Sequence, residues 1–116
     1  ELLGMDDLAG VVTAVTGMET TVDDLLVYGR RRVNLMRAFN AREGMTRDQD
    51  TLPKRLYDDP LQDGASAGAT VDRARNAEAI DTYYRLAGWD PETGNPPRET
   101  LEELDLGWVA DKLALP

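Results

Sequence analysis

The stretch TVDDLLVYGRRRVNLMRAFNAREG, residues 21 to 44, is the most clearly specified element of the sequence and decides the fold. Thr21 can cap the first turn of a helix, Asp24 places a carboxylate near the exposed amides of that turn, and Gly44 ends the helix. The predicted helix covers 22–43 and spans about 33 Å. Its apolar residues recur at helical spacing in two neighbouring stripes, one of Val22, Leu25, Leu26, Gly29, Val33 and Met36 and the other of Tyr28, Leu35 and Phe39. Because this apolar arc covers nearly half the circumference, we expect the helix to be central.

Capping residues, glycines and prolines divide the rest of the chain into further helical segments. A first helix is expected from a cap at Asp6 or Asp7 to about Thr16. A third long helix is expected from Thr70 or Asp72 to Ala87, after a flexible surface connection at 63–69. Short helical turns are expected after Pro53, after Pro97 and over 108–113. The pattern predicts one all-α domain over 1–116, an irregular bundle of about five to six helices.

Composition restricts the chemistry that the chain could perform. A net charge of −9 disfavours binding to nucleic acid or to an anionic membrane, because both require a basic surface. Without cysteine or histidine, the chain has no thiolate or imidazole ligand for a metal or an iron–sulfur cluster, and it lacks the commonest general base. No apolar run approaches the roughly 20 residues that span a bilayer. We expect a cytoplasmic protein with no catalytic residue and no metal ligand of its own.

Basic residues gather in one part of this acidic chain. Residues 30–55 contain eight basic and three acidic side chains, a local charge of +5. Asn40 falls at the centre of the apolar arc of the predicted helix, and Arg32 and Glu43 fall at its edge, so we expect these polar groups to be partly buried and hydrogen-bonded to the loop that follows.

Residues 40–55 would then act as a polar clamp. Its candidate residues, either for the clamp or for the wall of a cofactor or substrate channel, are Asn40, Arg42, Glu43 and Arg47. The alternative is that the arginines pair with the domain's own carboxylates. Arg31 lies opposite the apolar arc, so replacing it should cost less stability than replacing Asn40 or Glu43.

Other polar and aromatic clusters have simpler interpretations. The acidic residues Glu99, Glu102, Glu103 and Asp105 are most simply a solvated face, and RDQD at 47–50 lacks the glycine and distal glutamate of a calcium loop. The large aromatic residues are expected to anchor the core or its edge: Tyr57, Tyr83, Tyr84, Trp89 and Trp108.

Two long stretches resemble a known enzyme family. RRRVNLMRAFNAREGMTRDQDTLPKRL at 30–56, followed by DTYYRLAGWDPETGNPPRETLEELDL at 81–106, is similar to the C-terminal domain of the tungsten or molybdenum aldehyde:ferredoxin oxidoreductases. The leading segment 6–29 also resembles the helix and turn that precede the long helix in that family.

The resemblance implies a C-terminal fragment of a larger oxidoreductase. In that family an aldehyde is oxidised to a carboxylate at a metal held by a paired pterin, and electrons pass through one [4Fe–4S] cluster to ferredoxin. The motifs that hold these cofactors lie upstream of the matched part, so the resemblance implies that the fragment holds no cofactor, is inactive alone, and helps to wall the cofactor and substrate channel together with the upstream domains. The alternative is a stand-alone helical module for protein interaction or scaffolding.

Overall fold

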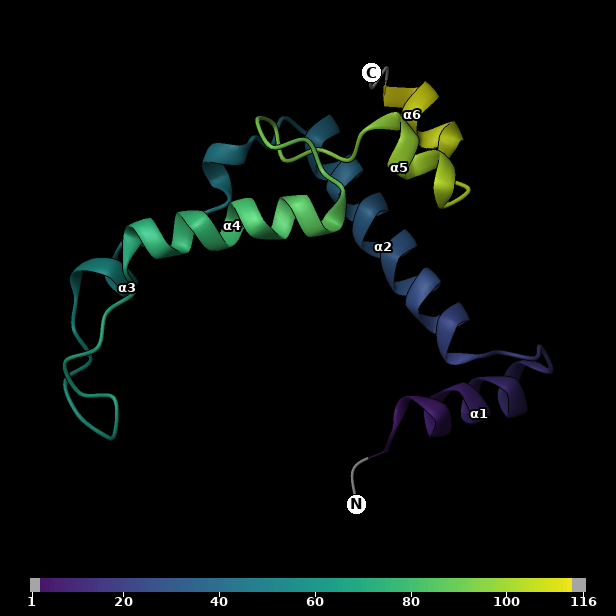
Figure 1. Cartoon of the computed structure of the whole chain (residues 1–116), viewed down its shortest axis with the longest axis horizontal. Helices are drawn as coiled ribbons and strands as arrows, with labels where there is room; N and C mark the ends of the chain where they lie inside the picture. Colours follow the sequence, from purple (N-terminus) through teal and green to yellow (C-terminus); the bar gives the residue numbers. More distant parts are fainter. Residues whose placement is uncertain (1–2, 114–116) are drawn as a thin grey trace.

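The computed structural model describes residues 3–113, and these form helices with no strand among them (Figure 1). The elements are α1 (Met5–Thr16), α2 (Val22–Arg42), the 3₁₀ turn η1 (Arg47–Gln49), α3 (Arg55–Asp58), α4 (Arg73–Ala87), α5 (Arg98–Glu103) and α6 (Gly107–Leu113). The all-α prediction and the long second helix are confirmed.

Most of the predicted helix ends are also found. The backbone N–H of Asp24 donates to Thr21 Oγ1 at 3.2 Å, and the Thr21 N–H donates back to the Asp24 carboxylate at 2.8 Å, a reciprocal cap of α2. Asp72 caps α4 by accepting from the N–H of Arg75, and Gly88 ends that helix with φ +70°. The start of α1 differs, because Gly4 is its N-cap and the carboxylate of Asp7 accepts the Gly4 N–H.

The helices form an open arch (Figure 1). α1, α2 and α4 follow one another along this arch, α5 and α6 pack against each other, and α6 packs onto α2. The radius of gyration is 18.5 Å, whereas a compact domain of this length has one of about 13 Å. The chain therefore exposes much more surface than a closed bundle.

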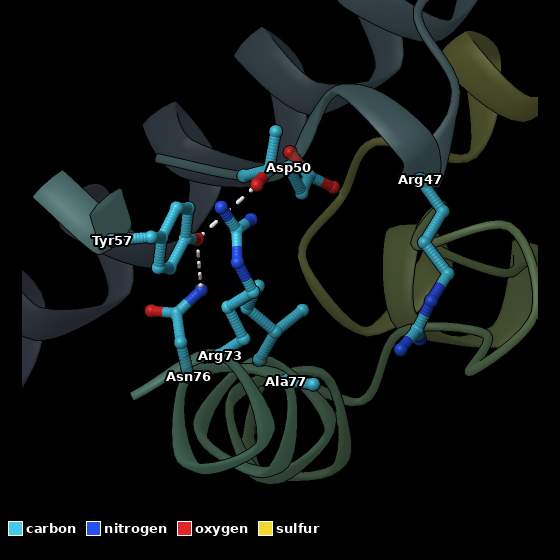
Figure 2. A pocket seen from close by; sticks show the side chains of 8 residues that line it. Arg47, Asp50, Tyr57, Arg73, Asn76 and Ala77 are labelled. Carbon is cyan, nitrogen blue, oxygen red and sulfur yellow. Dashed lines mark hydrogen bonds between the residues drawn. The ribbon is translucent and has the colours of Figure 1, made fainter. Parts of the chain in front are cut away.

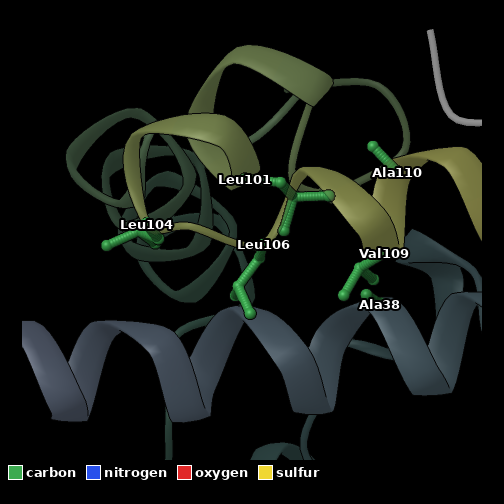
Figure 3. Close-up of a cluster of buried hydrophobic side chains, with 6 residues drawn as sticks. All are labelled: Ala38, Leu101, Leu104, Leu106, Val109 and Ala110. Atoms are coloured by element: carbon green, nitrogen blue, oxygen red, sulfur yellow. The ribbon is translucent and has the colours of Figure 1, made fainter.

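The apolar core is small and lies at one end of α2 (Figure 3). Ala38 is completely buried there, and its small side chain lets α6 approach the helix closely. The other core residues come from α5, α6 and the turn between them: Leu101, Leu104, Leu106, Val109 and Ala110.

The packed face of α2 is not the one that the sequence predicted. Its buried residues are Asn34, Arg37 and Ala38, whereas Asn40 is half-buried and Arg32 and Glu43 are exposed. Ala38 lies roughly 150° around the helix axis from the stripe that includes Val33 and Met36. The expectation that the apolar arc faces the core is therefore wrong for this chain, because its own packing uses the small residue Ala38 and hydrogen-bonded polar side chains instead.

The segment between α3 and α4 is a surface connection, as predicted. Residues 58–70 are all exposed, and the loop is closed by a pair of backbone hydrogen bonds between Leu61 and residues 68 and 69.

Candidate functional site: the polar junction of α2 and α4

A network of polar side chains joins α2, the turn after it and α4. We call this set the polar junction, and it comprises Asn34, Arg37, Arg47, Asp50, Tyr84 and Trp89. Arg37 is at its centre and is only 5% exposed. Its guanidinium donates through Nη1 and Nη2 to the two oxygens of Asp50, at 2.9 and 2.8 Å, in a two-point ion pair.

Local structure places Asp50 opposite Arg37. The N–H of Thr46 donates to Gln49 Oε1 at 2.8 Å, which holds η1, and the N–H of Asp50 then donates to the carbonyl of Arg47 at 2.9 Å. These bonds turn the chain sharply after α2, so that Asp50 lies next to a helix whose last residue is Arg42.

Asp50 and Tyr84 share a hydrogen bond that shifts both of their pKa values. Burial alone would raise the pKa of Asp50, but hydrogen bonds from Arg37 and Tyr84 and the charges of Arg37 and Arg47 outweigh burial and hold this pKa below its usual range. Burial and the bond to the Asp50 carboxylate raise the pKa of Tyr84 to about 12. At neutral pH Tyr84 is therefore protonated and donates to Asp50, and Asp50 is ionised.

Trp89 and Gly94 complete the packing around Arg37. The Arg37 guanidinium lies 5.3 Å from the ring centroid of Trp89, and Trp89 Nε1 donates to Asn34 Oδ1 at 2.9 Å. Gly94 has φ +69°, and a Cβ added there would lie 2.5 Å from both Arg37 Nη2 and the Tyr84 hydroxyl. The loop after Trp89 can therefore approach the ion pair only because residue 94 is glycine.

Arg47 extends the junction to the outer surface of α4. Its guanidinium donates to the carboxylate of Asp81 and to the carbonyl of Pro91, and it lies 5.0 Å from the ring centroid of Tyr84. The hydrogen bond that Arg47 donates to Asp81 is the main cause that raises the pKa of Arg47. Arg47 thus ties the start of η1 to α4 and to the loop that follows α4.

A cavity of about 210 Å³ lies beside the junction (Figure 2). Figure 2 shows Arg73 and Asn76 extending from α4 toward Tyr57 and Asp50. Asn76 Nδ2 and the N–H of Leu52 both donate to the Tyr57 hydroxyl, at 3.0 and 3.1 Å. Arg73 pairs with Asp58, so the cations around this cavity already have carboxylate partners within the chain.

The four sequence candidates lie in different environments. Arg47 is part of the polar junction, whereas Arg42 and Glu43 pair with each other at 2.8 Å on the exposed end of α2. Asn40 is half-buried, and its carbonyl accepts the N–H of Met45 at 2.9 Å. The turn after α2 is therefore held by a polar clamp, but its central residues are Arg37 and Asp50.

Sequence reasoning missed most of the junction. Asn34 lies three residues before Arg37 and four before the small residue Ala38, so all three share one face, a pattern that could have indicated the packed face of α2. The alternative expectation for the basic residues is observed directly, because five of them pair with carboxylates of the same chain: Arg30, Arg31, Arg37, Arg42 and Arg47.

The aromatic and acidic residues occupy the kinds of position expected of them. Tyr84 is buried, whereas Tyr83 and Trp108 are 50% and 59% exposed, so of the two expected places, core or core edge, only the edge is open to them. Tyr83 nonetheless meets Trp89 edge-on, with ring centroids 5.4 Å apart. The acidic residues of α5 and the turn after it are exposed, as expected of a solvated face.

Neither a cluster of metal ligands nor a membrane-spanning helix is found within residues 3–113. Among residues 3–113 there is no group of three or more histidine, cysteine, aspartate or glutamate side chains that could hold a metal ion. No helix in the same range is both long and apolar enough to cross a bilayer.

Comparison with known proteins identifies relatives for almost the whole chain. The family described as "Aldehyde ferredoxin oxidoreductase, domains 2 & 3" matches residues 1–106. The tungsten-containing aldehyde ferredoxin oxidoreductase of Pyrococcus furiosus is 42% identical over 106 residues, which is 90% of this chain and 17% of that protein. The proteins of the same name from Pyrococcus horikoshii and Thermococcus kodakarensis are 39% and 38% identical over 105 residues, with the same coverage.

A solved structure has the same fold. The active-site complex BamBC of benzoyl coenzyme A reductase, in complex with 1,5-dienoyl-CoA, matches with a TM-score of 0.74 and 30% sequence identity. The match covers 95% of this chain and 15% of that one. The chain therefore spans about a sixth of the length of each of these relatives.

Proposed function

The chain belongs to the aldehyde ferredoxin oxidoreductase family, and from this premise we propose that it is the C-terminal helical domain of an enzyme that oxidises aldehydes to carboxylates. In the proposed enzyme the electrons pass through a [4Fe–4S] cluster to ferredoxin, and the protein is cytoplasmic. The observation that carries the proposal is the family match over residues 1–106.

The residues of this chain do not fit the family's cofactors. It has no cysteine to bind an iron–sulfur cluster, and its described residues include no group of three potential metal ligands. The tungsten or molybdenum, its paired pterin and the cluster would therefore be held by the upstream domains of the same polypeptide. The chain alone would be inactive.

The proposed role of the chain is to wall the cofactor and substrate channel. The polar junction supports this role, because its ion pair and the hydrogen bond from Tyr84 to Asp50 fix the angle between α2 and α4. Arg42, Glu43, Asn40 and Arg47 remain the candidates for contact with the channel. Arg42 and Glu43 are exposed at the end of α2, where an upstream domain could meet them.

The test uses the native polypeptide that carries this chain. We expect an open reading frame that continues upstream of Glu1, about one tungsten or molybdenum per polypeptide, and aldehyde oxidation coupled to ferredoxin reduction. A reading frame that begins near Glu1, or a full polypeptide that turns over no aldehyde, would overturn the proposal and favour the stand-alone interaction module.

The channel role has its own test in the same polypeptide. Glu43→Gln should change KM for the aldehyde without lowering the metal content, whereas Arg75→Gln, on the exposed surface of α4, should change neither. Identical kinetics for both variants would argue against a channel contact at Glu43.

A further inference from the structure

The most apolar face of α2 is largely uncovered in the described chain, although Val22 and Leu25 at its start are half-buried. Leu26, Val33 and Met36 belong to the first stripe of the helix and are 55%, 40% and 52% exposed. They lie away from the face on which Ala38 meets α6. Such a stripe on a helix of 21 residues is typical of a face that packs against another structure.

α1 shows the same property. Ala9 is its only buried residue within the described chain, whereas Leu8, Val11 and Val15 recur at helical spacing and are all exposed. α1 packs against α2, so the two helices that follow each other in sequence both leave apolar side chains uncovered.

A groove beside α6 extends the uncovered surface. It has a volume of about 440 Å³ and lies between Leu35 and Phe39 of α2 and Trp108 of α6. Phe39 and Trp108 are both more than half exposed. The second apolar stripe of α2 therefore also has room for side chains from another structure.

The exposed area has the size of a permanent interface. The accessible surface of the chain is 8689 Å², whereas a folded monomer of 12.8 kDa has about 6,300 Å². The excess of about 2,400 Å² corresponds to one side of an obligate interface, which buries roughly 2,000–5,000 Å² over both partners. A short peptide could not cover it.

We propose that α1 and the two apolar stripes of α2 form the surface on which the upstream part of the same polypeptide packs, an inference that rests on the proposed function. The chain spans 17% of the length of its relatives, so the proposed parent has enough further sequence to cover this area. In that parent the preceding residues join the chain at α1, which holds the two surfaces at high effective concentration.

Net charge argues against a lipid surface as the occupant. The chain as a whole carries a net charge of −9, although α2 itself has five arginines and two aspartates. An anionic membrane would repel a chain of this net charge. An interface within one folded polypeptide needs no such attraction.

The test places a photo-crosslinking residue in the full native polypeptide. Met36→p-benzoylphenylalanine puts the probe on the stripe, and Arg75→p-benzoylphenylalanine is the control on the exposed surface of α4. We expect the probe at 36 to crosslink within the same polypeptide, to residues that precede Glu1, with a yield that does not change on dilution. The probe at 75 should give a several-fold lower yield.

Other crosslinking results would overturn the proposal. A product of doubled mass whose yield falls on dilution would assign the surface to a second copy, and capture of a different protein would assign it to a separate partner. A yield at 36 no higher than at 75 would mean that the stripe is uncovered.

A second measurement needs no substitution. Hydroxyl-radical oxidation of Met36 in the native polypeptide should be several-fold slower than in the urea-unfolded polypeptide, and equal rates would overturn the proposal. Aldehyde oxidation measured on the same sample separates the two ideas. An active enzyme with an unprotected stripe would refute the docking surface and leave the proposed function standing, whereas an inactive polypeptide with a protected stripe would refute the function alone.

Discussion

Gly94→Ala should destabilise the polar junction more than the addition of a single methyl group usually does. The added Cβ would lie 2.5 Å from Arg37 Nη2 and from the Tyr84 hydroxyl, and 2.6 Å from Cζ of Tyr84. Carbon does not approach nitrogen or oxygen this closely without a bond. Either the loop after Trp89 must move outward or the ion pair between Arg37 and Asp50 must open.

The expected cost has two parts. A residue with a side chain at φ +69° is strained by about 1–2 kcal/mol relative to glycine. Forcing a methyl group into a packed site adds about 1–3 kcal/mol. With an unfolding entropy of about 2.1 cal/mol/K per residue, each kcal/mol lowers Tm by about 4 °C in a chain of 116 residues, so the total loss is roughly 8–20 °C.

Gly68→Ala is the matched control. Gly68 has φ +81° and no atom within 4 Å of its added Cβ, so that variant suffers only the backbone strain. Thermal melts of both variants can be followed by the fluorescence of Trp89 in a Trp108→Phe background, because Trp89 lies against Arg37. Equal losses of Tm in the two variants would show that the close approach at Gly94 costs nothing and would refute the reasoning.

The remaining predictions concern single contacts and pH. Arg31→Ala should lower the free energy of unfolding by about 1–2 kcal/mol, because Arg31 Nε donates to the Leu104 carbonyl at 2.8 Å. Glu43→Ala, at the exposed end of α2, should lower it by less than about 0.5 kcal/mol. Denaturant titrations that show a larger loss for Glu43→Ala than for Arg31→Ala would support the sequence-based expectation instead. Asp50→Asn should cost about 3–5 kcal/mol, because it removes the anion that faces a buried guanidinium, and a loss under 1 kcal/mol in the same titrations would contradict this. The lowered pKa of Asp50 means that its stabilisation is present above the unfolded pKa of about 3.9 and is lost as the pH falls through the folded value, so acid titrations of Asp50→Asn should show a shallower loss of stability below about pH 4. The pKa of Tyr84 is raised, so its stabilisation is complete below its unfolded pKa of about 10 and is lost as the pH rises toward about 12, and Tyr84→Phe should flatten this alkaline loss.

The ion pair between Arg37 and Asp50 holds the polar junction together, and removing either partner should strongly destabilise it. Arg37 is buried and Asp50 is largely so, and their mutual attraction offsets the loss of water only while both carboxylate oxygens of Asp50 and both terminal guanidinium nitrogens of Arg37 are paired. Tyr84 adds a further donor to Asp50, and the Arg37 guanidinium also donates to the carbonyl of Thr93 at 3.3 Å. The junction therefore links three separate segments through one pair of charges.

Local patterns predicted the elements of this fold well. The cap at Thr21, the glycines that end α1 and α4, and the helical spacing of apolar residues all act within a few residues, so they can be read from the chain directly. The polar character of 40–55 also predicted that the turn after α2 is fixed by side-chain contacts. Arg47 is the one candidate that lies in the polar junction.

The residues at the centre of the junction could not be predicted in the same way. Asp50 and Tyr84 are separated by 34 positions, and their contact depends on the path of the turn after α2 and on the direction in which α4 runs. A helical wheel shows which side chains share a face, but not which face meets a neighbour. On α2 the helical wheel predicted that the apolar stripes would pack against the core, whereas the packed face is the one with Asn34, Arg37 and Ala38.

The helical class, the ends of the long helices and the family could all be predicted from the amino-acid sequence, because these properties rest on local spacing and on long matched stretches. The side of α2 that is covered could not be predicted, because it depends on how the helices pack. The chain's own segments cover the face with Ala38, where a small side chain permits close approach, and they leave Val33 and Met36 exposed. Burial of apolar area stabilises a face only where a partner surface exists to meet it, and within the described residues that surface lies on the side of Ala38.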